Sequence, residues 1–301
     1  MSAMDPAVKD GLDYAAVPWE RFHHAFGPGS DLPERLERIR CADARGADDQ
    51  VDVLWDMICH QGTPNAAGAL AVPFLIRIAL THPVPLPRAL HLVGTLARRS
   101  HLGDGTRTGL LRTSAPADSL AFEPSGYVST WSIQAARQAL TEGADLLLPL
   151  LSHTVSAVRT GAAYALSAAT PPARDRITAA LHAHLDAEDD PVTRASLVLA
   201  IGELAWEQRD ADAVARARAW WQDPARPAEV RISAALAWLC LVDDPIPADL
   251  DALLDTEATD HLADLLSPVP WLRHLAEKQG LHTALTQMRN PDDYAWIADL
   301  Y

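Results

Sequence analysis

"AVRTGAAYALSAA", residues 157–169, is the stretch of this 301-residue chain that decides the fold, because the chain repeats it twice more. Two later stretches align with it without gaps, "VTRASLVLAIGEL" (192–204) and "EVRISAALAWLCL" (229–241). Each copy has an arginine near its start, and successive arginines are 35 and 37 residues apart: Arg159, Arg194 and Arg231. Self-similarity at such a period is the sequence signature of repeat architectures.

Small and apolar residues recur at matching places in the three copies. Counted from the residue before each arginine, their offsets of 4, 7, 8 and 11 describe one stripe of an α-helix. The stripes are Val158, Ala162, Ala165, Leu166 and Ala169; Leu197, Ala200, Ile201 and Leu204; and Val230, Ala234, Ala237, Trp238 and Leu241. The alanines predict close approach between neighbouring helices.

A second predicted helix precedes each copy, over 144–153, 173–187 and 211–223, and acidic, proline-bearing turns separate the elements. A helix–turn–helix unit of this length cannot bury its apolar face alone, so stacked units must bury it against one another. No stretch alternates apolar and polar residues with a period of two, so we expect no strands. The prediction is an all-α fold.

The three copies resemble HEAT repeats, in which antiparallel helix pairs stack. The resemblance covers roughly residues 144–242 and implies a right-handed α-α superhelix, an armadillo-like solenoid, whose second helices line the concave face. The middle copy departs from the pattern with Thr193 and with Ser196–Leu197 where alanine is usual. Residues 14–99, with "AFGPG", "CHQGT" and "AVPFL", resemble the N-terminal part of a group of actinomycete HEAT-repeat proteins. This resemblance implies a fold and a bacterial origin, and it does not indicate a particular activity.

We therefore expect one α-solenoid over residues 1–301. Its predicted parts are an N-terminal cap (1–50), a first helix pair (51–100), an inserted loop (101–128), HEAT-like repeats (129–242) and C-terminal capping helices (243–301).

Charge and cysteine usage narrow the environment. The formal net charge is −15, and residues 201–301 hold 18 acidic and 8 basic residues. Such a field disfavours nucleic acid and anionic membranes and attracts a basic partner, although net charge also serves solubility alone. The three cysteines show no CxxC spacing, the first 20 residues carry four acids and no apolar core, and no apolar run is long enough to span a bilayer. We expect a cytoplasmic protein with reduced thiols.

The motif "HQGTP" (60–64) raises the question of a functional histidine. Val51, Leu54, Trp55 and Ile58 predict an amphipathic helix over 50–62 that ends at a left-handed Gly62. His60 and Gln61 would then occupy its last turn, with Thr63 capping the next helix and Pro64 at its first position. The motif therefore has a structural explanation, and His60 and Gln61 are kept only as binding candidates.

The loop over 101–128 interrupts the helical rhythm for longer than most connections. A long insertion of this kind can bind a partner or gate access across the concave surface, or it can be a flexible loop without such a role. The sequence leaves both interpretations open. Its binding candidates, with the tryptophan that follows, are Arg107, Arg112, Phe122, Tyr127 and Trp131.

No catalytic constellation stands out. There is no GxSxG elbow, no phosphate loop and no histidine pair at metal-ligand spacing, so we expect no metal and no cofactor. The favoured hypothesis is a non-catalytic protein-binding scaffold, specifically an immunity or regulatory protein that holds a basic partner on its concave face. Arg159, Arg194 and Arg231 would line that face. The alternatives are a HEAT-like enzyme such as an alkylpurine DNA glycosylase, and a small-molecule-binding protein with a role in natural-product biosynthesis or resistance.

Overall fold

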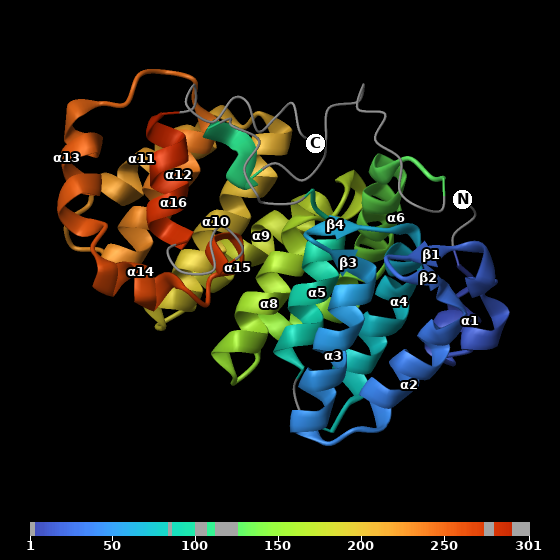
Figure 1. Cartoon of the computed structure of the whole chain (residues 1–301). Helices are drawn as coiled ribbons and strands as arrows, with labels where there is room; N and C mark the ends of the chain where they lie inside the picture. The colour runs from blue at the N-terminus through green and yellow to red at the C-terminus, as the bar shows by residue number, and fades with distance from the viewer. Residues whose placement is uncertain (1–3, 84–85, 100–106, 112–125, 274–279, 291–301) are drawn as a thin grey trace. The chain divides into compact units, whose positions relative to one another are not determined.

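The computed structural model describes residues 4–83, 86–99, 107–111, 126–273 and 280–290, and it is mostly helical (Figure 1). The chain divides into two compact units. Unit 1 comprises residues 1–100 and 113–173, and unit 2 comprises residues 101–112 and 174–301. The mostly helical structure confirms the prediction of an all-α protein.

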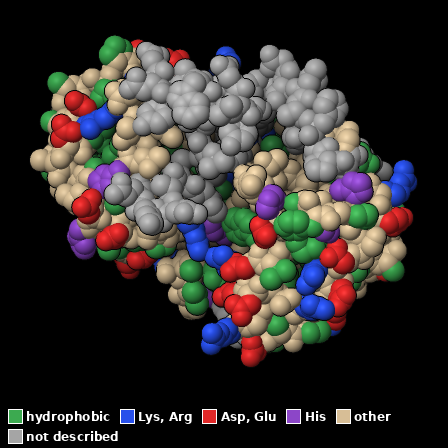
Figure 2. Space-filling model, in the orientation of Figure 1, with side chains coloured by type: hydrophobic (Ala, Val, Ile, Leu, Met, Phe, Trp, Pro, Cys, Tyr) green, Lys and Arg blue, Asp and Glu red, His purple; other side chains and the backbone are tan. Residues whose placement is uncertain are grey.

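Unit 1 contains most of the N-terminal half. Its α-helices are α1 (Pro6–Asp10), α2 (Leu32–Cys41), α3 (Ala44–Ile58), α4 (Ala66–Thr81), α5 (Pro87–Leu96), α6 (Ser129–Glu142), α7 (Ala144–Leu147) and α8 (Ser156–Ser167). Short 3-10 turns η1 (Tyr14–Ala16), η2 (Trp19–Arg21), η3 (Gly29–Asp31) and η5 (Leu148–Ser152) join them. Acidic and basic side chains lie next to one another on the described surface of this unit (Figure 2), as in the i,i+4 pair of Glu34 and Arg38 on α2.

Unit 2 contains the later repeats and the C-terminal helices. Helix α9 (Pro171–Ala187) starts at the end of unit 1 and runs into unit 2. The remaining elements are η4 (Arg107–Leu111), α10 (Pro191–Gln208), α11 (Ala211–Gln222), α12 (Ala228–Leu241), α13 (Ala248–Glu257), α14 (Asp260–Leu266), α15 (Pro270–Arg273) and α16 (Gly280–Arg289). None of the helices in the described part of the chain combines the length and apolar composition needed to cross a membrane.

The three repeated arginines occupy the same register. Each is the fourth residue of its helix, α8, α10 or α12, and its backbone N–H donates to the carbonyl four residues earlier. The predicted stripes are buried along all three helices, apart from partial exposure of Leu241. Within unit 2, α10 packs closely on α12, since a Cβ added to Gly202 would lie 2.9 Å from the Cβ of Ala237. Small residues thus permit close helix contact, as predicted.

Two small antiparallel strand pairs contradict the expectation of no strands. Strand β1 (His23–His24) pairs with β2 (Gly27–Pro28), and β3 (Cys59–His60) pairs with β4 (Thr63–Pro64). In the second pair the turn residues Gln61 and Gly62 both have positive φ, 50° and 78°. Positive φ at both central positions defines the type I′ turn that suits a two-residue β-hairpin. The apolar periodicity of the preceding helix carries no information about this turn.

The predicted boundaries around "HQGTP" are therefore wrong. Helix α3 ends at Ile58, so His60 and Gln61 lie in the hairpin rather than in a last helical turn. Thr63 and Pro64 form strand β4 instead of starting a helix. Asn65 caps α4, its side chain accepting a hydrogen bond from the N–H of Gly68 at 3.0 Å. An asparagine is among the best residues for this position.

Part of the predicted inserted loop is ordered in unit 2. Residues 107–111 form η4, which packs against α10 and α12 with Leu110 and Leu111 buried. The Arg107 guanidinium donates to the carbonyls of Asp244 at 2.6 Å and Val242 at 3.4 Å, just beyond the end of α12. Positive charge there is favourable because a helix C-terminus carries partial negative charge.

Candidate functional site

A pocket of about 360 Å³ lies in unit 1 between α4 and α6, and we call it the α4–α6 pocket. Its lining residues are Met4, Ala69, Leu70, Pro73, Trp131, Gln134, Ala135, Gln138, Ala139 and Glu142. This volume falls within the range of small-molecule sites, and its lining of apolar groups with a few polar ones is typical of them.

One face of α6 forms the longer wall of the pocket. The residues that line it recur every three or four positions, so they fall on a single stripe of the helix. Trp131 stands at one end of the stripe and Glu142 at the other, 11 residues later, which corresponds to about 16 Å along the helix axis. Ala135 and Ala139 between them are small, and their size leaves the space that the pocket occupies.

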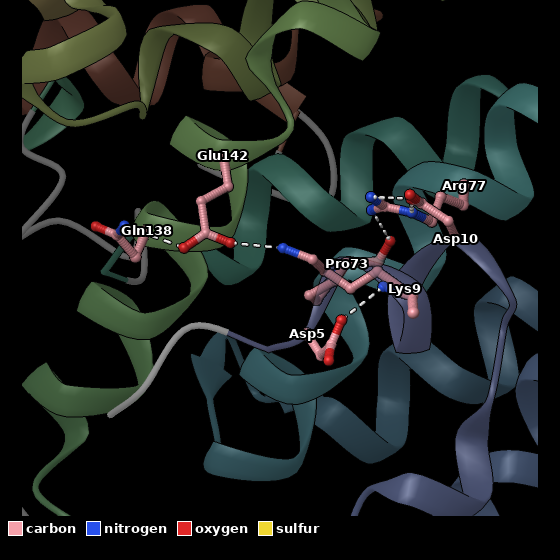
Figure 3. Close-up of polar contacts among 8 residues, drawn as sticks. Asp5, Lys9, Asp10, Pro73, Arg77, Gln138 and Glu142 are labelled. Carbon is pink, nitrogen blue, oxygen red and sulfur yellow. Dashed lines mark hydrogen bonds and ion pairs between the residues drawn. The ribbon is translucent and has the colours of Figure 1, made fainter.

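The opposite wall comes from α4, at its internal proline. Ala69, Leu70 and Pro73 line the pocket. Proline has no N–H, so Pro73 cannot donate to the carbonyl of Ala69 as the helical ladder requires. The helix continues to Thr81, and the Arg77 guanidinium donates to the Pro73 carbonyl at 3.0 Å (Figure 3). This wall is therefore mainly apolar.

The polar end of the pocket is the carboxylate of Glu142. The Lys9 ammonium donates to its Oε2 at 2.8 Å, and the Gln138 amide donates to its Oε1 at 3.2 Å (Figure 3). Lys9 is 7% exposed and belongs to α1, which packs against α4. A second ion pair, Asp10 to Arg77 at 2.6 Å, also fixes α1 to α4. The N-terminal helix is therefore tied to both walls.

An aromatic cluster continues from the other end of the pocket. Tyr127 stacks on Trp131 with ring centroids 4.8 Å apart, and Phe22 stacks on Tyr127 at 5.4 Å. Offset stacking of this kind stabilises the arrangement of the three half-buried rings. The structure thus brings together Tyr127 and Trp131, two of the predicted binding residues, and it adds Phe22, which the sequence analysis missed.

His60 and Gln61 lie elsewhere in unit 1, on the β3–β4 hairpin. The His60 Nδ1 lies 3.1 Å from Asp56 Oδ1. The His60 ring packs edge-on against the exposed ring of Phe26, with ring centroids 5.3 Å apart. The N–H of Ala25 donates to the carbonyl of Met57 at 2.9 Å, which joins the β1–β2 turn to the end of α3. These residues do not line the α4–α6 pocket.

The predicted arginines bind turns of the fold near them. Arg159 donates to the carbonyls of His153 at 2.9 Å and Thr154 at 3.2 Å, in the turn before α8. Arg231 donates to the carbonyl of Trp221 at 3.1 Å and pairs with Glu257. Arg194 holds the same register on α10, and its Nε is buried without a hydrogen-bond partner among the described residues. Arg112 and Phe122 lie outside the described residues.

The pocket residues Gln134, Gln138 and Glu142 were missed from the sequence. Their signal is a run of polar side chains at four-residue intervals that continues the face of Trp131. These three residues are exposed, as a polar stripe on a helix ordinarily is, so the run alone does not indicate a site.

The pocket offers hydrogen-bonding side chains and apolar surface. Among the described residues, no group of three or more His, Cys, Asp or Glu side chains is arranged to hold a metal ion.

Comparison with known proteins gives no match to any family model, curated protein or solved structure.

Proposed function

We propose that this chain is a non-catalytic binding protein on a HEAT-like helical scaffold, and that the α4–α6 pocket holds a small organic ligand. The pocket carries the proposal, because its volume of about 360 Å³ lies between two helices, with aromatic and aliphatic walls and a polar end that opens to solvent. The shared register of α8, α10 and α12 supports the HEAT-like part.

A pocket-filling variant tests this function. In Ala139→Phe the new ring would occupy the pocket, and the matched control Ala219→Phe places the same ring on an exposed position of α11 in unit 2. Fragments screened by thermal shift should raise the melting temperature of the wild type and of A219F but not of A139F. A ligand at 100 times its Kd stabilises by about 2.7 kcal/mol, which such a screen detects. Hits that stabilise A139F equally would refute the pocket as the site.

A basic protein partner is the second candidate function. Residues 243–272 contain eight Asp and Glu residues and no Lys or Arg, and the carboxylates of Asp249, Asp260 and Asp264 are exposed in unit 2. A surface of one charge sign raises the association rate of an oppositely charged partner and makes binding salt-dependent.

Charge neutralisation tests the second candidate. A variant with amides at Asp249, Asp260 and Asp264 should fail to retain a stoichiometric basic protein that the wild type retains at low salt. The control carries the same change in unit 1, at the exposed residues Asp13, Glu20 and Asp49. Equal retention by both variants would remove the acidic stretch from consideration.

A further inference from the structure

We infer that the ligand of the α4–α6 pocket is an elongated amine, an apolar or aromatic body that ends in an ammonium group. This inference rests on the proposed function and specifies the charge and shape of the ligand. Trp131 receives the body of the ligand and Glu142 its ammonium group.

The charge follows from the polar end. Of the described residues that line the pocket, Glu142 alone carries a formal charge. A carboxylate offers about four lone-pair sites, and the hydrogen bonds from Lys9 and Gln138 to Glu142 use two. The remaining sites favour a donor, and charge-assisted hydrogen bonds are the stronger kind. Lys9 offsets part of this negative charge from outside the pocket, so the preference for a cation depends on the lone pairs that Lys9 and Gln138 leave open.

The length follows from the α6 stripe. Trp131 and Glu142 are separated by about 16 Å of helix, so a ligand with a ring beside the indole and an ammonium about 3 Å from the carboxylate must be elongated. Between the ends, Ala135 and Ala139 face Leu70 and Pro73 across the pocket. This middle section has room for a narrow chain and offers it mainly apolar contacts.

Lys9 shows that the site already accommodates an ammonium group. Its Nζ reaches Glu142 from α1 at 2.8 Å, on a side chain that is 9% exposed (Figure 3). Lys9 does not line the pocket, so it contacts the carboxylate from outside it. The ligand's ammonium and that of Lys9 therefore share one carboxylate, and removal of Lys9 should tighten the binding of an amine.

A matched series of probes separates charge from shape. The probes are 4-phenylbutylamine, the neutral 4-phenylbutanol and the anionic 5-phenylpentanoate, titrated into the full chain by isothermal calorimetry at low salt. We expect the amine to bind most tightly and the acid least. In Glu142→Gln the affinity for the amine should fall by about tenfold or more, since a hydrogen bond between two charges becomes one to a neutral amide. The affinity for the alcohol should change little.

Lys9→Met provides the opposing variant. It removes the competing ammonium and leaves Glu142 in place, so the amine should bind several-fold more tightly than to the wild type, and the alcohol should not. The ratio of amine to alcohol affinity is the decisive quantity, because a general loss of folding would lower both affinities together.

The outcomes separate the inference from the proposed function. Equal affinities for the three probes that are all lost in A139F would overturn the amine and leave the pocket as a ligand site. The same holds if none of the probes binds while fragments from the screen do so in an A139F-sensitive way. An amine selectivity that E142Q abolishes and K9M increases would establish the inference.

Discussion

The contact between α5 and α8 makes a sharp prediction for Gly94→Ala. A Cβ at Gly94 would lie 2.4 Å from Cδ1 and 2.8 Å from Cε1 of Tyr164, and 3.3 Å from the backbone nitrogen of Ala165. Carbon atoms in good contact are about 3.5–4.0 Å apart. The Tyr164 ring is fully buried, with the Arg98 guanidinium 3.7 Å from its centroid and the His91 ring at 5.2 Å. The ring therefore has little room to withdraw.

Two opposing effects set the magnitude. Alanine favours a helix by about 1 kcal/mol relative to glycine. Overpacking a core costs about 1–3 kcal/mol, and an overlap of more than 1 Å beside a clamped ring places the cost near the upper end. The net loss should be about 2 kcal/mol, which corresponds to a roughly 30-fold loss of amide protection.

Hydrogen exchange measured by mass spectrometry on peptides from α5 and α8 gives this quantity locally, without assuming that both units unfold together. The comparison is a double-mutant cycle with Tyr164→Ala, which removes the ring atoms that the new methyl would meet. In that background G94A should stabilise the peptides by about 1 kcal/mol. The reasoning is refuted if G94A stabilises the wild type, or if its effect is the same in both backgrounds.

Three further predictions use other parts of the fold. Gly62→Ala should destabilise unit 1 by about 1–2 kcal/mol in urea unfolding, because Gly62 has φ of 78°, and an unchanged midpoint would contradict the type I′ turn. At pH 8 a disulfide reagent should react with one thiol of the native protein, that of exposed Cys41, and with three thiols after unfolding. Cys59 and Cys240 are buried in the native protein, and burial raises the pKa of Cys59 to about 12. Burial is the largest cause of a lowered pKa at His182, and the nearby Arg216 is the second. As pH falls, His182 therefore takes up a proton in the unfolded chain before it does so in the folded chain, and the stability of the fold should decrease below about pH 6.5. A urea midpoint in His182→Gln that falls as steeply between pH 7.5 and 5.5 as in the wild type would exclude that origin.

Helical periodicity was a sound guide to the elements but not to their ends. The stripe from Val158 to Ala169 and its two copies correctly predicted three buried helices in one register. That signal is strong because burial recurs with the helical period over many residues. The hairpin at Gln61–Gly62 depends instead on two dihedral angles, and a helix C-terminus also accepts a glycine there, so the sequence did not distinguish the two.

The candidate site was harder to predict than the helices. Trp131 and Tyr127 were found because aromatic residues beside a long loop are conspicuous, but their partner Phe22 lies about 105 residues earlier in the chain. The pocket depends on which face of α6 meets the proline of α4, and on Lys9 reaching across from α1. These are contacts between residues distant in the chain, and no local pattern encodes them.

The position of η4 in unit 2 has a consequence for synthesis on the ribosome. Leu111 emerges early, but part of the surface that buries it belongs to α12, which is complete only at Leu241, 130 residues later. At a synthesis rate of about 5–20 residues per second, Leu110 and Leu111 lack this part of their packing surface for roughly 7–26 s. During that interval two apolar side chains are available to chaperones. In a circular permutant whose chain begins after η4, the ribosome would synthesise η4 after α12. This order should shorten the delay and raise the yield of folded protein.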